Sequence, residues 1–222
     1  REELWRGVSE LVHPMISSDG RYLVFTEGEQ ESLNTDVVLY DFLKNNQIAI
    51  NKKPTKGSIP CISKSATKIA FPCWTLDETI PQIAMYDIAT GKQTQFKDGV
   101  ECWRPLFSND ECHIYYIQKE THDSHFIIKQ YDVTTGEKSI VLKQPFDIWD
   151  IAVSPSGKYI AYAGNKDANW DLFIYDTEHK HSRQITHTIG DEWDPAFGVS
   201  DDELWFAGVF GFNDGIYHVR LK

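Results

Sequence analysis

The chain has 222 residues, of which 41% are hydrophobic and 13% aromatic, enough for one sizeable core and too few for two large domains. Its 33 Asp and Glu residues outnumber 22 Lys and Arg residues, and the resulting formal charge of -11 argues against nucleic acid as a partner, because phosphates would be repelled. No apolar run reaches the roughly 18 residues needed to cross a bilayer, so we expect no membrane span. The chain starts at Arg1 without a signal-like segment, which we interpret as a mature form or an excised domain.

Five segments of the sequence align with one another without a gap. They begin at His13, Ile59, Arg104, Asp150 and Asp194. The second position of each segment forms a column of Pro14, Pro60, Pro105, Ile151 and Pro195, spaced by 46, 45, 46 and 44 residues. An aromatic residue follows eleven positions after each member of this column. Tyr40, Tyr86, Tyr131 and Tyr175 form another column with the same period. Two separate columns with one spacing indicate five repeated units.

Each repeated unit predicts four short strands, A to D. Runs rich in Val, Ile, Tyr and Phe alternate with turns such as Ser18-Asp19-Gly20 and Thr90-Gly91-Lys92. Units of about 40 to 50 residues with four strands are typical of β-propeller blades. We therefore predict an all-β chain that forms a single β-propeller domain over residues 1–222, with five four-stranded blades. In chain order, the predicted blades are residues 13–55, 59–99, 104–145, 150–188, and 194–222 together with 1–9.

The fifth unit ends after its third strand, whereas an unassigned segment precedes the first unit. We predict that this N-terminal segment, residues 1–9, pairs with the last blade and closes the ring. Closure removes the open strand edges that an unclosed propeller would leave. We expect the closed disc to be a monomer.

The repeat resembles the TolB-like, WD-like β-propeller family. The resemblance covers nearly the whole chain and is clearest in "DIAVSPSGKYIAYAGNKDANWDLFIYDTEHKHSRQITH" from Asp150, where a Ser-Pro-Ser-Gly-Lys turn precedes an Ile-Ala-Tyr strand and a strand that ends in Tyr-Asp. It implies a bacterial, often periplasmic scaffold that binds protein or peptide partners. A cytoplasmic location stays open.

Aromatic and charged residues gather in two kinds of connection that a propeller places on one face, the D–A segments between blades and the B–C loops. The D–A segments contain Trp103, Arg104, Trp149, Asp150, Trp193 and Asp194, with His13 in the first unit, and the B–C loops add Trp74 and Trp170. Exposed aromatic residues on such loops are typical of recognition surfaces. We predict that these nine residues bind a protein or peptide partner. A sugar or a calcium ion is an alternative ligand, since carboxylates lie among the aromatic residues. Inter-blade packing alone is the competing interpretation of Trp193-Asp194-Pro195.

Motifs for catalysis are missing from the sequence. It has no GxSxG, HExxH, GxxxxGK[ST] or GxGxxG, and His122 and His125 lack an assigned third metal ligand. We therefore predict a non-catalytic binding scaffold without a cofactor. A carbohydrate-binding or glycoside-processing propeller, and a propeller domain cut from a larger peptidase, stay open as alternatives. The four cysteines have no metal-site spacing, so we expect buried free thiols or one disulfide.

Overall fold

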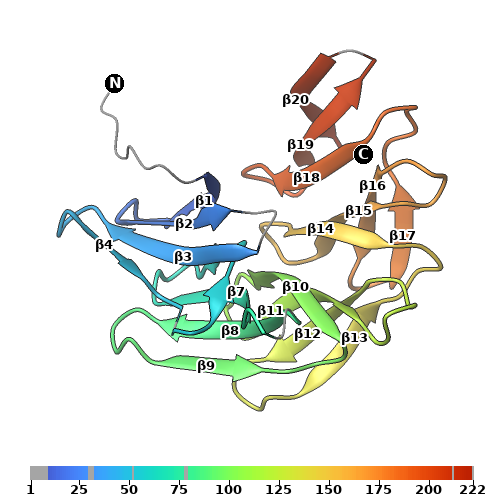
Figure 1. Cartoon of the computed structure of the whole chain (residues 1–222). Coiled ribbons are helices and arrows are strands. Elements are labelled where there is room, and N and C mark those ends of the chain that lie inside the picture. Colours follow the sequence, from blue (N-terminus) through green and yellow to red (C-terminus); the bar gives the residue numbers. More distant parts are fainter. Residues whose placement is uncertain (1–9, 30–32, 52, 78–79, 212, 222) are drawn as a thin grey trace. The chain divides into compact units, whose positions relative to one another are not determined.

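The computed structural model of the chain describes residues 10–29, 33–51, 53–77, 80–211 and 213–221 (Figure 1). These residues form strands and connections that group into two compact units, Arg1–Pro105 and Leu106–Lys222. The strands belong to five antiparallel sheets, and each sheet is one blade. Within the described ranges, no helix is long and apolar enough to cross a membrane.

Blades 1 and 2 belong to unit 1. Blade 1 contains β1 (Leu11–Ile16), β2 (Tyr22–Glu29), β3 (Asn34–Asp41) and β4 (Asn46–Ala49), hydrogen-bonded in chain order. Blade 2 contains β5 (Lys56–Gly57), β6 (Cys61–Ile62), β7 (Lys68–Trp74), β8 (Gln82–Asp87) and β9 (Gln93–Phe96). Its first strand is interrupted, because β5 and β6 are two short pieces that both pair with β7.

Blade 3 begins with β10 (Glu101–Phe107), which starts in unit 1, and continues with β11 (His113–Lys119), β12 (Ile127–Asp132) and β13 (Lys138–Leu142). Unit 2 also holds blade 4, with β14 (Ile148–Val153), β15 (Tyr159–Gly164), β16 (Asp171–Asp176) and β17 (His181–Gln184). Blade 5 contains β18 (Glu192–Phe197), β19 (Glu203–Phe210) and β20 (Asn213–Arg220). The prediction of an all-β propeller with five blades is confirmed. The predicted closing strand falls on residues 1–9, outside the described residues, so closure stays a prediction.

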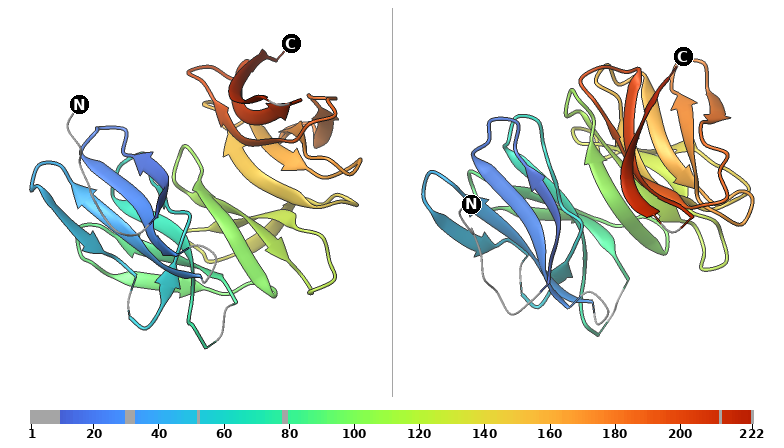
Figure 2. Two further views of the ribbon diagram at one scale, coloured as in Figure 1. Left: turned by 45° about the horizontal axis from the view of Figure 1, so that its top comes forward. Right: turned by 90° about the horizontal axis from the view of Figure 1, so that it is seen from above.

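The hydrophobic cores lie between neighbouring blades within each unit. In unit 2, Leu172 and Ile174 of blade 4 belong to the same buried cluster as Leu204 and Phe206 of blade 5. Figure 2 shows these two sheets face to face, in yellow to orange and in red. In unit 1, Val24, Val37 and Leu39 of blade 1 share a cluster with Ile69, Phe71 and Tyr86 of blade 2. Strands β2, β3, β7 and β8 of unit 1 and β16 and β19 of unit 2 are therefore held by packing on a neighbouring sheet as well as by their own ladders.

Turn residues link adjacent blades along one edge. In unit 2, the Asn109 amide donates to the Ser154 carbonyl at 2.7 Å, and the Ser156 backbone N–H donates to Asp201 Oδ1 at 3.0 Å. Unit 1 has a similar contact, in which Ser18 Oγ donates to the Lys64 carbonyl at 2.7 Å. The A–B turns therefore reverse the strands and also connect blade 1 to blade 2, blade 3 to blade 4 and blade 4 to blade 5.

Candidate binding surface

One backbone position of the repeat adopts a left-handed conformation in all five blades. The φ angles are 53°, 45°, 52°, 40° and 48° at His13, Ile59, Arg104, Asp150 and Asp194. None of the five is glycine, although this region is unfavourable for residues with a Cβ atom. The strand register shifts at this position in β1, β14 and β18, which identifies a β-bulge in the first strand of the blade. Trp193-Asp194-Pro195 is one copy of this bulge.

The two bulges of unit 2 contact each other through their acidic residues. The backbone N–H of Asp194 donates a hydrogen bond of 3.1 Å to Asp150 Oδ2. The Asp150 side chain is buried, with 4% of the residue exposed, whereas Asp194 is exposed. Asp150 thus connects blades 4 and 5, and Asp194 remains accessible to a ligand.

The aromatic residues next to these bulges are anchored by aspartates of the D–A segments. The Phe126 backbone N–H donates to Asp147 Oδ1 at 3.0 Å, and the Trp170 backbone N–H donates to Asp191 Oδ1 at 2.8 Å. Phe126 and Trp170 hold equivalent places in the B–C loops of blades 3 and 4. Phe126 also meets Trp149 edge to face, with ring centroids 5.2 Å apart. The same arrangement of loop aromatic and aspartate therefore occurs twice in unit 2.

We call the residues at and next to these bulges the Trp/Asp surface of unit 2. It comprises the exposed Asp194, the partly buried Trp149, Trp170 and Trp193, and the buried Asp150. All three tryptophans are partly buried, and Trp170 packs against the buried cluster of blades 4 and 5. His125, which the sequence suggested as half of a metal pair, lies 3.5 Å from Asp147 through its Nδ1 atom.

The predicted site residues of unit 1 have a different setting. Trp74 is 3% exposed and its indole N–H donates to the Leu33 carbonyl at 3.1 Å, so the expectation of an exposed ring is wrong for Trp74. The centroid of its ring lies 5.7 Å from the ring centroid of Trp103. Trp103 is partly buried, and its indole N–H donates a hydrogen bond to Glu101. His13 and Arg104 are partly buried at the bulge position. A pocket of about 410 Å³ adjoins Trp74 and is lined in part by Gln82, Gln95 and Lys97.

The cysteines differ in exposure. Cys61, Cys73 and Cys102 are buried and Cys112 is exposed, and none of the four forms a disulfide. Burial raises the pKa of Cys73 to about 12, which keeps this thiol protonated and unreactive at neutral pH. The expectation of burial is therefore wrong for Cys112, which lies in the exposed A–B turn of blade 3.

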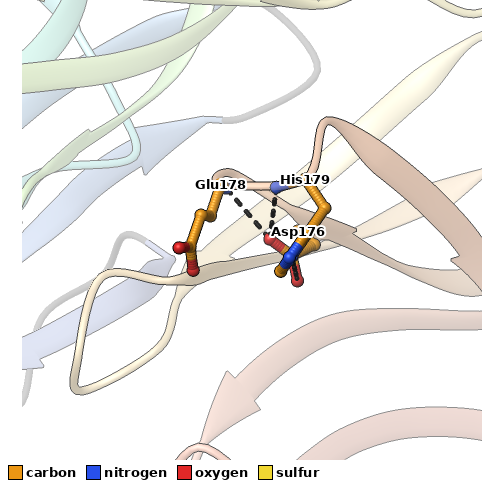
Figure 3. A group of neighbouring side chains, drawn as sticks. All are labelled: Asp176, Glu178 and His179. Atoms are coloured by element: carbon orange, nitrogen blue, oxygen red, sulfur yellow. Dashed lines mark hydrogen bonds and ion pairs between the residues drawn. The ribbon is translucent and has the colours of Figure 1, made fainter.

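The C–D turn of blade 4 brings Asp176, Glu178 and His179 together (Figure 3), with one ligand atom of each within 4.8 Å of the others. Asp176 Oδ1 accepts backbone hydrogen bonds from Glu178 and His179, both of 2.9 Å, and Oδ2 lies 3.0 Å from His179 Nδ1. The backbone hydrogen bond from His179 is the main cause that lowers the pKa of Asp176 to about 2. The carboxylate thus caps the turn, as in other blades. The equivalent residues Asp41, Asp87 and Asp132 accept similar hydrogen bonds.

A groove of about 600 Å³ lies beside this turn, and sequence reasoning did not find it. It is lined by residues of β15, β16 and β17 and by Leu221.

The capping aspartate of each C–D turn is the Asp of a Tyr-Asp pair, which was visible in the sequence as a repeated position. Its alignment with turn residues was the signal for the capping role.

Comparison with known proteins shows the fold. No protein-family model matches the chain, and no curated protein matches it by sequence. TolB from Acinetobacter baumannii has a similar structure, with a TM-score of 0.79 and 17% identity over 98% of this chain and 53% of that one. A putative TolB from Agrobacterium tumefaciens gives a TM-score of 0.81 and 14% identity, over 98% and 79% of the two chains. The chain thus spans about half the length of the Acinetobacter protein.

The same fold also occurs in enzymes. An oligogalacturonate lyase in complex with manganese gives a TM-score of 0.72 and 14% identity, over 97% of this chain and 63% of that chain. Peptidases are among the further similar structures. At such identities the likeness concerns architecture, because one fold serves many activities. The chain therefore has the β-propeller fold of TolB proteins.

Proposed function

We propose that the chain is a non-catalytic scaffold whose Trp/Asp surface binds a basic segment of a protein or peptide partner. The main support is an arrangement that occurs twice in unit 2. In each copy, an aspartate of the D–A segment anchors an aromatic residue of a B–C loop, and a Trp and an Asp follow in the same segment. Partly exposed tryptophans are common energetic anchors of interfaces. The chain's net charge of -11 favours a cationic partner. The resemblance of the repeat to the TolB-like family suggests that this binding takes place outside the cytoplasm.

Titration of a fluorescein-labelled hexalysine peptide into the full chain tests this proposal. We expect saturable binding that weakens with added salt, because the peptide pairs with carboxylates. Trp193→Ala removes an anchor, and a loss of about 2 kcal/mol corresponds to roughly thirtyfold weaker binding. Asp194→Asn removes an exposed charge, so its effect should shrink at high salt.

Trp205→Ala is the matched control for this titration. Trp205 is 43% exposed on β19 and lies outside the Trp/Asp surface. Its removal should leave peptide affinity unchanged. Equal losses for Trp193→Ala and Trp205→Ala, or no saturable binding by the unmodified chain, would contradict the proposal. Circular dichroism of each variant checks that it is folded.

The pocket of unit 1 supports a second candidate, an acidic sugar ligand. Amide groups of Gln82 and Gln95 together with the cation of Lys97 line this pocket, and such groups bind sugar hydroxyls and carboxylates. The fold similarity to an oligogalacturonate lyase agrees with this choice of probe. Calorimetry with trigalacturonate tests it, and Lys97→Gln should abolish the heat of binding. Absence of heat at millimolar sugar removes this candidate and leaves the peptide site untouched.

A further inference from the structure

A buried acidic pair occupies the boundary between blades 4 and 5. Glu192 starts β18, two positions before the bulge residue Asp194, and none of Glu192 is exposed. The equivalent positions of the other blades hold apolar or small residues, namely Leu11, Gly57, Cys102 and Ile148. Across the boundary is Asp171, the first residue of β16, which is 2% exposed. Blade 5 therefore has a carboxyl group at a position where the other four blades have an uncharged residue.

The hydrogen bonds of this pair satisfy only part of its oxygen atoms. Thr188 Oγ1 donates to Glu192 Oε1, and Thr186 Oγ1 donates to Asp171 Oδ1 at 3.2 Å. Glu192 Oε2 is buried and has no hydrogen-bond partner among the described residues. The Asn169 amide lies 3.4 Å from Asp171 Oδ2.

No basic side chain in the described part of unit 2 forms an ion pair with Asp171 or Glu192. Blade 1 differs at the position equivalent to Asp171, because Asp36 has Lys53 at 2.7 Å and Lys56 at 3.4 Å. Two ionised carboxylates without a cation are unfavourable in a buried place. Protonation of one of them removes most of that cost.

We propose that Glu192 is a proton-operated switch, whose neutral form holds the connection 186–194 in place and whose ionised form loosens it. Two hydrogen bonds of Glu192 hold this connection: Thr188 Oγ1 donates to its side chain, and its backbone N–H donates to the Trp170 carbonyl at 2.7 Å. The strand then continues directly into Trp193 and Asp194. The consequence for ligand binding rests on the proposed function of the Trp/Asp surface, but the switch itself does not.

The groups that face Glu192 have the net effect of raising its pKa. Burial raises its pKa, Asp171 of β16 and Asp191 of the same connection raise it further, and hydroxyl bonds from Thr188 and Thr186 oppose this in part. On the β19 side, Glu192 pairs with Gly208, which has no charge. A raised folded-state pKa means that the native chain binds the proton more tightly than the unfolded chain does. Its stabilising contribution is therefore complete below the unfolded pKa and is lost as the pH rises through the folded one.

Amide hydrogen exchange of the full chain between pH 4.5 and 8.5 tests the switch. After correction for intrinsic exchange rates, protection of residues 186–194 should fall with rising pH, by at most about tenfold per pH unit for a single proton. Glu192→Gln keeps the shape and cannot ionise, so its protection should not depend on pH. Glu192→Ile introduces the residue type that blade 4 has at this position and serves if the Gln variant does not fold.

Two controls make the outcome specific. Asp171→Asn removes a neighbouring negative charge that raises the pKa of Glu192. Glu192 then ionises more readily, so the midpoint of the loss of protection should move to lower pH. The equivalent connection of blade 4, residues 142–150, has Ile148 in place of Glu192 and should show no such change. Equal pH dependence in the unmodified chain and Glu192→Gln overturns the proposal. Protection restored at pH 8.5 by calcium also overturns it and assigns a cation site instead.

The switch and the proposed function fail in different ways. If both hold, hexalysine binding weakens above the midpoint in the unmodified chain and not in Glu192→Gln. If only the switch holds, exchange changes with pH although the peptide does not bind at any pH.

Discussion

The edge-to-face contact between Phe126 and Trp149 allows a quantitative test of the Trp/Asp surface. The two ring centroids are 5.2 Å apart and the ring planes make an angle of 69°, the favourable T-shaped geometry. Such a pair contributes about 0.5–1.5 kcal/mol beyond the area it buries. Both rings are partly buried, so each single Ala substitution also loses some apolar contact. We expect a coupling energy of about 1 kcal/mol between the two positions.

Urea unfolding of the unmodified chain, Phe126→Ala, Trp149→Ala and the double variant measures this coupling. A second cycle with Phe126→Ala and Trp205→Ala is the control, because Trp205 lies on β19 of blade 5 and stacks near His218. The control cycle should be additive within about 0.5 kcal/mol. Additivity of the Phe126 and Trp149 substitutions would refute the claim that the loop aromatic and the D–A tryptophan act as one structural element.

Two further outcomes follow from the turns. The lowered pKa of Asp176, about 2, means that its stabilising contribution is present above the unfolded value and is lost as the pH falls through the folded one, so Asp176→Asn should flatten the acid dependence of the melting temperature below pH 4. An unchanged acid limb in that variant speaks against the capping role. Cys112 is the one exposed thiol of the four, so a thiol reagent should modify one cysteine quickly in the native chain and all four after unfolding. Rapid modification of a second native thiol would contradict the burial of Cys61, Cys73 and Cys102.

The repeat was predictable because each blade needs the same turns and the same buried strand. Ser-Asp-Gly and Thr-Gly-Lys turns, with an aromatic residue at a constant spacing, were enough to predict five blades. The bulge was not predictable, since His, Ile, Arg and Asp occupy its left-handed position and none of them is the glycine that usually signals such a backbone.

Burial at the candidate site depended on the partner strand and not on residue type. Trp74 was grouped with the exposed aromatic residues of the B–C loops. It is instead the last residue of β7, and its indole N–H donates to the Leu33 carbonyl. Glu192 directly precedes Trp193 in a D–A segment, yet none of it is exposed. The alignment of Glu192 with Ile148 and Cys102 was the available signal that its position is buried.

The left-handed position in the first strand of each blade accepts side chains of very different chemistry. Since the backbone geometry is the same for an imidazole, an alkyl group, a guanidinium and two carboxylates, the shape of the strand does not depend on what is mounted there. A substitution at an exposed copy such as Asp194 thus changes the chemistry of the surface, whereas the buried copy Asp150 also links blades 4 and 5. The repeat thus fixes the backbone conformation of this position while leaving the chemistry of its side chain variable.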